Sequence, residues 1–379
     1  MKILSVSTIR PKKRADWWRM SHMAAILKEN GHEVHFVHYC RKSTYETLQD
    51  KEKYSNHSFV CFSSWFLSPL NIHIKHLKIL IKGDYDIVYC NGPCSVFYSV
   101  LGKILRKPIV FDMHGDVVEE FLLKNNNRNT TFKFKLMFIK FINWVSIKSA
   151  DRIICVSNKM IDNLHKKEGI PYEKMIYATN GVDLNFFRSL KEDEISEIKE
   201  DLGLEGKLVF GYIGDFQKWQ GIESFIEAAK NVKNSNVAFI FVGGAKKNAE
   251  KNLLFVPRVP IDQITKYYSI CDVLVLPRPK SVATDVAAPT KFAEYTSMGK
   301  PILTTNVGDA SKLVKKYNCG VVVESNDPKR LIVGINEFIN LSEEELIEMG
   351  CNSRKLAKQE FDWQKVSSNI NKLIDSLRH

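Results

Sequence analysis

The strongest constraint on the fold is a repeated alternation of short apolar segments with helical segments. In the first half of the chain the apolar segments, which are typical of strands, are 2–7, 32–37, 86–90, 108–112 and 152–156. Parallel strands need a crossover connection, and a helix between two strands supplies one. The pattern therefore predicts a doubly wound parallel sheet, in an N-terminal Rossmann-like domain at 1–185.

The same alternation restarts near residue 190. The expected strands of this second region are 208–214, 237–243, 272–277 and 301–305. We therefore predict an α/β chain of two Rossmann-like doubly wound domains, the second at 190–355, with a C-terminal helix in 356–379 that crosses back to the first. Ligands of open α/β sheets bind beyond the carboxyl ends of the strands, so two such domains predict a central cleft.

The positive charge of the chain is concentrated in its first half. Residues 1–190 contain 29 Lys and Arg against 17 Asp and Glu, whereas 191–379 contain 26 of each, and the net charge is +12. This asymmetry indicates an anionic partner for 1–190: nucleic acid, a membrane surface or an acidic substrate. Nucleic acid is disfavoured, because the sequence has no helix-turn-helix, zinc-finger or RNA-binding aromatic signature.

Two basic apolar segments favour an anionic membrane surface among these partners. In 132–148 the side chains of Lys133, Lys140 and Lys148 share one face of the expected helix, and 72–82 has a similar composition. Such segments can lie on an anionic bilayer. For 132–148, a buried helix with a solvated lysine edge is the alternative.

The cysteine pattern and the N-terminus bear on location. The cysteines are scattered and mostly lie in apolar runs, which is typical of a reducing compartment. Cys90 and Cys94 have no second ligand pair at zinc spacing, so we expect no metal site. The sequence shows neither a signal peptide nor a bilayer-spanning run. We expect a cytoplasmic protein that is either free in the cytosol or bound peripherally to the cytosolic face of a membrane.

The most informative motif for chemistry is the segment 287–302. Pro289 and Thr290 predict a helix start with Thr290 as the N-cap, and Gly299 predicts the helix end. The free amides at that start, with Lys291 in the first turn, are suited to binding a diphosphate. Glu294 lies one turn further, where its carboxylate can accept hydrogen bonds from sugar hydroxyls. A plain capped surface helix is the alternative reading.

Several motifs in a fixed order give the chain a family resemblance. They are the region around His114, Asp151 to Ser157, Asn180 to Asp183, Gly211 to Gly221, Val242 to Gly244, and Pro289 to Pro301. Together they resemble the retaining glycosyltransferases of family 4, which have the GT-B fold and act in polysaccharide biosynthesis. The resemblance implies metal-independent transfer of a sugar, with retention, from a UDP- or GDP-linked donor to a hydroxyl of a glycan or lipid-linked saccharide. No cofactor beyond this co-substrate is implied.

The resemblance also implies roles for individual residues. Glu294 matches the glutamate that bonds the ribose, Lys291 the phosphate-facing end of the same helix, and His114 a histidine near the donor sugar. These three are the predicted catalytic residues. The predicted donor-binding residues are Gly214, Lys218, Asp285, Pro289, Thr290, Lys291 and Glu294.

The sequence departs from the family pattern at the donor site. Val286 stands where a glutamate usually contacts the donor sugar, and Asp285 is the adjacent carboxylate. Asp215 and Gln220 stand where an arginine and a lysine usually neutralise the diphosphate, so Lys218 and Lys291 are the candidate replacements. These departures leave two alternatives open: a nucleotide-sugar epimerase of the same fold, or a non-catalytic nucleotide-sugar-binding subunit.

The first βα turn, 8–19, is a further departure. It carries basic residues in place of the usual glycine pair. They either bind a charged group of the donor or acceptor, or belong to a solvated loop.

Overall fold

The computed structural model of the protein describes residues 1–8, 14–41, 57–62, 78–92, 95–125, 129–244 and 252–377. The chain divides into two compact units, one formed by Met1–Ala178 with Ser367–His379 and the other by Thr179–Val366. Parts of the basic turn at 8–19 and of the basic segment at 72–82 lie outside the described residues.

The first unit is built on a seven-stranded sheet with the order β3-β2-β1-β4-β5-β6-β7, in which every pair is parallel. The strands are β1 (Lys2–Thr8), β2 (Glu33–Arg41), β3 (His57–Phe62), β4 (Ile87–Asn91), β5 (Ile109–Met113), β6 (Arg152–Cys155) and β7 (Met175–Tyr177). The doubly wound sheet predicted from the alternation is therefore confirmed.

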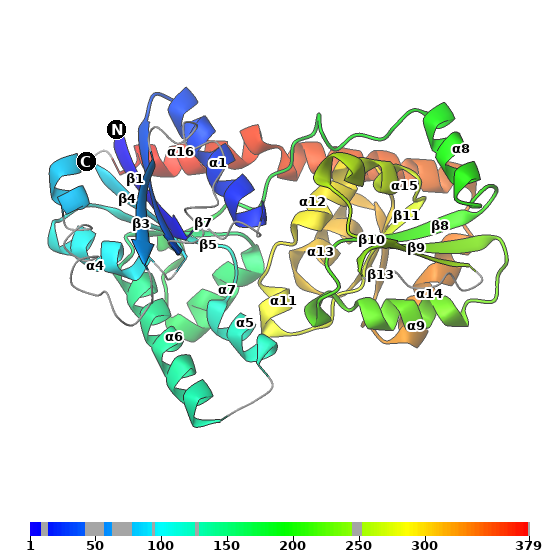
Figure 1. Cartoon of the computed structure of the whole chain (residues 1–379), viewed down its shortest axis with the longest axis horizontal. Coiled ribbons are helices and arrows are strands. Elements are labelled where there is room, and N and C mark those ends of the chain that lie inside the picture. The colour runs from blue at the N-terminus through cyan, green and yellow to red at the C-terminus, as the bar shows by residue number, and fades with distance from the viewer. Residues whose placement is uncertain are drawn as a thin grey trace. The chain divides into compact units, whose positions relative to one another are not determined.

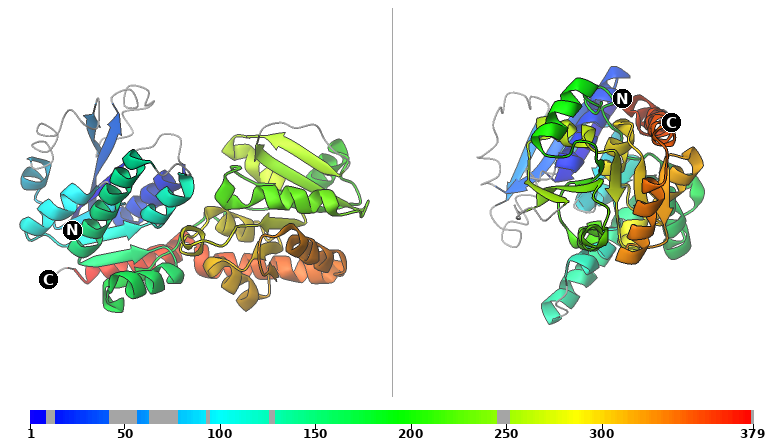
Figure 2. Two further views of the ribbon diagram at one scale, coloured as in Figure 1. Left: turned by 90° about the horizontal axis from the view of Figure 1, so that it is seen from below. Right: turned by 90° about the vertical axis from the view of Figure 1, so that its right-hand side faces the viewer.

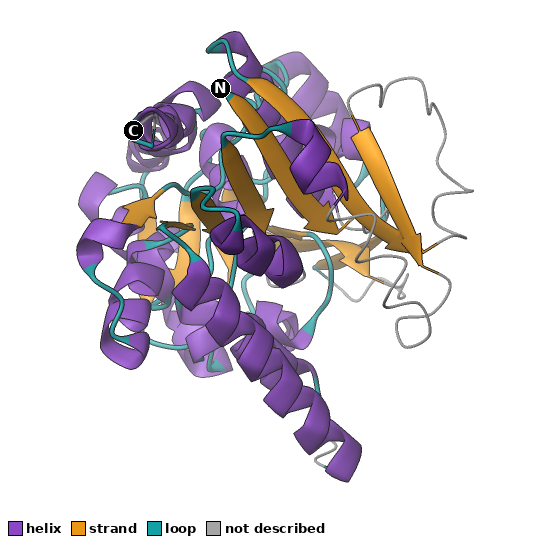
Figure 3. Cartoon of the chain, turned by 90° about the vertical axis from the view of Figure 1, so that its left-hand side faces the viewer, coloured by secondary structure: helices purple, strands orange, loops and turns teal. Residues whose placement is uncertain are grey.

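Helices flank the sheet of the first unit (Figures 1 and 3). They include α1 (Arg14–Glu29), α4 (Val96–Ile104), α5 (Val117–Lys124), α6 (Thr130–Ser149) and α7 (Asn158–Glu168). Among these, α6 packs against both α4 and α5. The strand order reverses between the neighbours β1 and β4, which is the position where open α/β sheets leave room for ligands.

The second unit is built on a six-stranded parallel sheet with the order β10-β9-β8-β11-β12-β13. The strands are β8 (Leu208–Ile213), β9 (Val237–Gly244), β10 (Leu253–Pro257), β11 (Val273–Leu276), β12 (Ile302–Thr305) and β13 (Gly320–Val323). The helices are α8 (Glu192–Asp201), α9 (Ile222–Asn231), α10 (Ile264–Ser269), α11 (Val282–Asp285), α12 (Thr290–Ser297), α13 (Gly308–Tyr317), α14 (Pro328–Ile339) and α15 (Glu343–Leu356).

Both faces of the second sheet are buried under helices (Figure 2). Alternate residues of β8 point to opposite faces: Val209 and Ile213 belong to the core under α10, α12 and α13, whereas Phe210 and Tyr212 belong to the core under α9 and α14. Burial on both sides explains why the strand reads as a continuous apolar run.

The last helix, α16 (Trp363–Asp375), contributes to both units. Its residues through Val366 group with the second unit, and those from Ser367 onward group with the first. Within the second unit, Val182 forms a parallel bridge with Asp362. A side chain at Gly181 would overlap the ring of Trp363, so glycine is required there for the two segments to approach.

Candidate functional site

The strand order of the second unit locates a ligand site between β8 and β11. These strands are neighbours at which the order reverses, and open α/β sheets bind ligands beyond the carboxyl ends of such a pair. Gly214 directly follows β8, and Arg278 lies two residues beyond β11. Both residues therefore lie where the topology predicts a ligand site.

The N-terminus of α12 lies at this site. The helix begins at Thr290, and the residue before it, Pro289, is extended with φ −69° and ψ 123°. The prediction that Thr290 is the N-cap is therefore wrong, because extended Pro289 occupies the cap position and Thr290 is already helical. Among the residues that the structure describes, no side chain caps this helix start, so its first amides can bind an anion. The predicted end at Gly299, with φ +68°, is confirmed.

Lys291 is held against the end of β8. Its Nζ donates a hydrogen bond to the Tyr212 hydroxyl at 2.6 Å and lies 4.5 Å from the centroid of that ring. A Cβ on Gly214, which has φ +144°, would overlap the Lys291 side chain, so glycine makes room for the lysine. Burial lowers the pKa of the Lys291 ammonium to about 7; the charge of Glu294 acts to raise it, and that of Arg278 to lower it further.

Glu294 lies one helical turn after Lys291 and is fixed by Tyr268. The Tyr268 hydroxyl donates a hydrogen bond to Glu294 Oε2 at 2.6 Å. Tyr268 itself is fully buried and packs edge-to-face on Tyr295. Burial raises the pKa of Glu294, while the Tyr268 hydrogen bond and the Lys291 charge oppose that rise. Within the described residues Oε1 makes no hydrogen bond, which leaves an oriented acceptor for hydroxyl groups.

Arg278 is a cation of this site that the sequence interpretation missed. It is 7% exposed, its Nη1 donates to the Thr284 carbonyl at 3.4 Å, and its charge lowers the pKa of Lys291. The available signal was an arginine between Pro277 and Pro279, directly after a buried strand. Arg278 adds positive charge to a site where Asp215 and Gln220 replace the usual basic pair.

Other predicted donor-site residues have different environments. Lys218 is exposed on a 3-10 helix at Lys218–Gln220. Asp285 Oδ1 accepts a hydrogen bond from the Gly308 amide at 2.8 Å, at the start of α13, and Val286 is buried. Asp215 is exposed and pairs with Arg258 at 3.6 Å. The structure thus brings Gly214, Lys291 and Glu294 together with Arg278.

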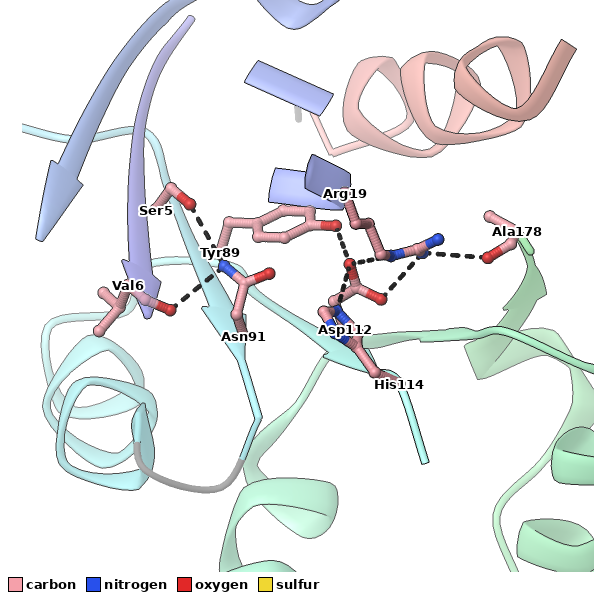
Figure 4. A network of polar contacts seen from close by, with 8 residues as sticks. All are labelled: Ser5, Val6, Arg19, Tyr89, Asn91, Asp112, His114 and Ala178. Atoms are coloured by element: carbon pink, nitrogen blue, oxygen red, sulfur yellow. Dashed lines mark hydrogen bonds and ion pairs between the residues drawn. The ribbon is translucent and has the colours of Figure 1, made fainter. Parts of the chain in front are cut away.

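His114 belongs to the first unit, where it follows β5 and rests on Asp112 (Figure 4). Its Nε2 lies 3.3 Å from Asp112 Oδ2, and its side chain is 24% exposed. Arg19 donates from Nε and Nη2 to both carboxylate oxygens at 3.1 Å, and the Tyr89 hydroxyl donates at 2.7 Å. Burial alone would raise the pKa of Asp112, but the charges of Arg19 and His114 outweigh it and hold that pKa well below its usual range.

The role of Arg19 differs from the sequence interpretation. We expected the basic residues of 8–19 either to bind a substrate group or to be solvated, but Arg19 is 2% exposed and also donates to the Ala178 carbonyl at 3.0 Å. It is a structural cation that anchors α1 to the ends of β5 and β7. Arg19 and Asp112 are far apart in the sequence, so the sequence alone does not predict that they pair.

Helix α6 has an exposed apolar face. Its exposed large apolar side chains are Phe134, Met137, Phe138, Phe141 and Trp144. The reading of 132–148 as a buried helix is therefore wrong. Across the described part of the chain, no helix combines the length and apolar character needed to cross a bilayer. Nor do the described His, Cys, Asp and Glu side chains form a group able to hold a metal ion.

Two family models match the chain. "Glycosyltransferase Family 4" matches residues 19–186, and "Glycosyl transferases group 1" matches residues 194–356. Between them they span most of both units.

Relatives and solved structures agree with these matches. The capsular polysaccharide biosynthesis glycosyltransferase CapM of Staphylococcus aureus is 26% identical, over 81% of this chain and 82% of its own. The UDP-Gal:alpha-D-GlcNAc-diphosphoundecaprenol alpha-1,3-galactosyltransferase of Escherichia coli is 25% identical, over 84% and 81%. The structure of Anabaena HepE in complex with UDP superposes with a TM-score of 0.76 at 17% identity, over 99% of this chain and 100% of HepE, and so shares the fold. With two doubly wound sheets and a family model matched to each unit, the chain belongs to the group 1 glycosyltransferases of GT-B fold.

Proposed function

We propose that the protein is a retaining glycosyltransferase whose second unit binds a nucleotide-sugar donor. The observation that carries this proposal is the convergence of the uncapped α12 start, Lys291, Arg278 and Glu294 beyond β8 and β11. Amides and cations suit a diphosphate, and a fixed carboxylate suits the paired hydroxyls of a ribose. The names of the galactosyltransferase and of the HepE complex favour UDP as the nucleotide.

The proposed reaction develops negative charge on the diphosphate, which is the group that Lys291 and Arg278 are proposed to bind. The bond between the anomeric carbon and the diphosphate oxygen breaks, and the nucleoside diphosphate leaves with the electron pair. The acceptor oxygen bonds to the same face of that carbon, and its proton passes to the departing phosphate. Lys291, Arg278 and the α12 amides stabilise the departing charge, so the proposed step needs no metal ion. His114, steadied by Asp112, is proposed to hydrogen-bond the sugar.

The proposed acceptor is a hydroxyl of a glycan or of a lipid-linked saccharide, in polysaccharide biosynthesis. The names of the Escherichia coli and Staphylococcus aureus relatives support this class. A lipid-linked acceptor requires the enzyme to work at a membrane surface. We propose that the cytoplasmic protein docks there through its first unit.

Helix α6 supports this docking. Its exposed apolar side chains recur at three- and four-residue spacings from Phe134 to Trp144, which places them on one stripe. The same helix carries Lys133, Lys135, Lys140 and Lys148 and no acidic residue. An apolar stripe with lysines beside it suits the headgroup region of an anionic leaflet.

A thermal-shift panel of UDP-, GDP- and dTDP-sugars tests the donor assignment, because a ligand of the folded state raises the unfolding temperature. We expect a UDP-sugar to give the largest shift and Lys291→Met to abolish it. Lys266→Met removes an exposed lysine from the same unit and is expected to keep the shift. A shift that survives Lys291→Met would contradict the assignment.

The same samples separate the competing functions. Incubation of donor alone changes the donor sugar only if the protein is an epimerase. Incubation with donor and lipid-linked or soluble saccharides gives product if it is a transferase. A protein that binds donor but forms no product with any acceptor would favour the non-catalytic subunit, for which Asp215, Gln220 and Val286 are the motivating departures.

A further inference from the structure

A groove in the first unit lies between α5, α6 and α7, apart from the donor-site residues. Its volume is about 470 Å³, within the range of roughly 300–1,000 Å³ that is usual for small-molecule sites. Figure 1 shows the three helices that form it. The side chains that line it include Asp116, Glu119, Phe141, Asn143, Trp144 and Lys167.

One wall of the groove is aromatic. Phe141 and Trp144 lie three positions apart on one side of α6. Their ring centroids are 6.5 Å apart and the ring planes are inclined by 27°. They remain 59% and 51% exposed. The face of an aromatic ring is electron-rich and attracts weakly positive C–H groups. The C–H face of a pyranose ring presents such groups over a similar area.

The groove is also lined by hydrogen-bond acceptors. Asp116 Oδ1 receives both the Val118 and the Glu119 amides at 3.1 Å, and within the described residues Oδ2 receives none. The Asn143 side-chain oxygen is buried and has no hydrogen-bond partner there. An unpaired buried acceptor favours a ligand that donates hydrogen bonds, as sugar hydroxyls do.

The charge of the groove disfavours an anion. Three carboxylates, those of Asp116, Glu119 and Glu168, line it against two lysines, Lys140 and Lys167. Lys167 is already paired with Glu119 at 3.4 Å. A phosphate would therefore face excess negative charge, whereas an uncharged polyol would not.

We propose that this groove binds the saccharide portion of the acceptor, and this rests on the glycosyltransferase function proposed above. Asp116 follows His114 by two residues, so the groove begins beside the histidine proposed to contact sugar. The apolar stripe of α6 continues from Phe141 and Trp144, so a lipid tail attached to the saccharide would lie along that stripe.

Saturation-transfer NMR on the full chain tests the proposal with methyl β-glycosides of glucose, galactose and N-acetylglucosamine, which carry no tail that could reach the rest of the α6 stripe. Inorganic pyrophosphate, followed by the width of its phosphorus NMR signal, is the anionic comparison. We expect at least one glycoside to bind and pyrophosphate not to bind in the groove. Trp144→Ala is expected to weaken glycoside binding about tenfold. Asn143→Leu is expected to weaken it as well, and Trp144→Phe, which keeps an aromatic face, to retain most of it.

Phe134→Ala is the matched control, because Phe134 is an exposed aromatic residue on the same helix outside the groove lining. Equal losses in Phe134→Ala and Trp144→Ala, or binding of pyrophosphate that Trp144→Ala removes, would overturn the proposal. UDP binding is measured on the same samples. Absent glycoside binding with intact UDP binding overturns the groove assignment alone, whereas absent UDP binding overturns the donor assignment.

Discussion

Asp112 Oδ2 lies 3.3 Å from His114 Nε2, and the same carboxylate is held by Arg19 and Tyr89 in the interior of the first unit. The carboxylate favours a proton on Nε2 of the histidine, which leaves Nδ1 as the ring nitrogen able to accept a hydrogen bond. His114, which is only partly exposed, is thus oriented by the buried side chains of Asp112, Arg19 and Tyr89 (Figure 4).

Asp112→Ala is expected to destabilise the protein by about 3–5 kcal/mol, because it leaves the Arg19 guanidinium buried without its partner. Asp112→Asn keeps the shape and part of the hydrogen bonding, so a smaller loss is expected. Urea unfolding of both variants measures these differences. A loss below about 1 kcal/mol for Asp112→Ala would show that the pair does not stabilise the fold.

The same pair predicts an acid dependence of stability. The pKa of Asp112 in the folded protein is well below the unfolded value of about 3.9, so its contribution is fully present above the unfolded pKa. It is lost as the pH falls from the unfolded pKa toward the folded one. The free energy of unfolding should therefore drop more steeply below pH 4 in the wild type than in Asp112→Asn. Parallel curves would contradict this.

Lys291 predicts that UDP binding is coupled to proton uptake. The pKa of this lysine is about 7 in the unliganded protein, and a diphosphate beside it would raise that pKa. Near pH 8 the free lysine is mostly neutral, so binding should take up close to one proton, and near pH 6 much less. Calorimetry in two buffers of different ionisation enthalpy measures the uptake. Undiminished uptake in Lys291→Met would assign it to another group.

Gly214→Ala is expected to weaken UDP binding strongly, because the new Cβ would overlap the Lys291 side chain. It is also expected to cost about 1–3 kcal/mol of stability, because the alanine would have to adopt a φ of +144°. Gly203→Ala is the matched control: its φ is +65°, but a Cβ there meets no atom of the described residues within 4 Å. It should lose stability through backbone strain alone and keep UDP affinity. Unchanged UDP affinity in Gly214→Ala would contradict the packing of Lys291 on this glycine.

The lysines of α6 predict salt-sensitive binding to vesicles of phosphatidylglycerol. Lys133→Glu with Lys135→Glu should weaken binding tenfold or more, since each cation near an anionic surface contributes about 1 kcal/mol. Lys312→Glu with Lys329→Glu reverses the same number of exposed charges in the second unit and is expected to have a much smaller effect. Similar losses in both pairs would indicate that net charge, rather than α6, determines binding.

The sheets and the α12 motif were predictable from sequence because they depend on local patterns. Buried parallel strands read as apolar runs, and Gly299 marks a helix end through its left-handed backbone. Arg278 and the Arg19–Asp112 pair were not predictable in this way. Their roles depend on which strand ends and helices meet in space, and 93 positions separate Arg19 from Asp112.

The position of the α12 N-cap and the exposure of α6 both depend on structure that residue type alone does not determine. Thr290 has good N-cap chemistry, but the φ and ψ of Pro289 decide where the helix begins. In α6, apolar composition indicated burial as readily as membrane contact, and the packing of neighbouring helices decides which side chains stay exposed. Composition alone does not distinguish the two.

The most direct test of the donor site is calorimetric binding of UDP and of 2′,3′-dideoxy-UDP to the wild type and to Glu294→Gln. If Glu294 accepts hydrogen bonds from the ribose hydroxyls, Glu294→Gln weakens UDP binding about tenfold or more, in line with roughly 1.5–3 kcal/mol for hydrogen bonds to a charged group. It should leave the affinity for the dideoxy nucleotide unchanged. Equal losses for both nucleotides, or no loss for UDP, would contradict the assignment of Glu294 to the ribose.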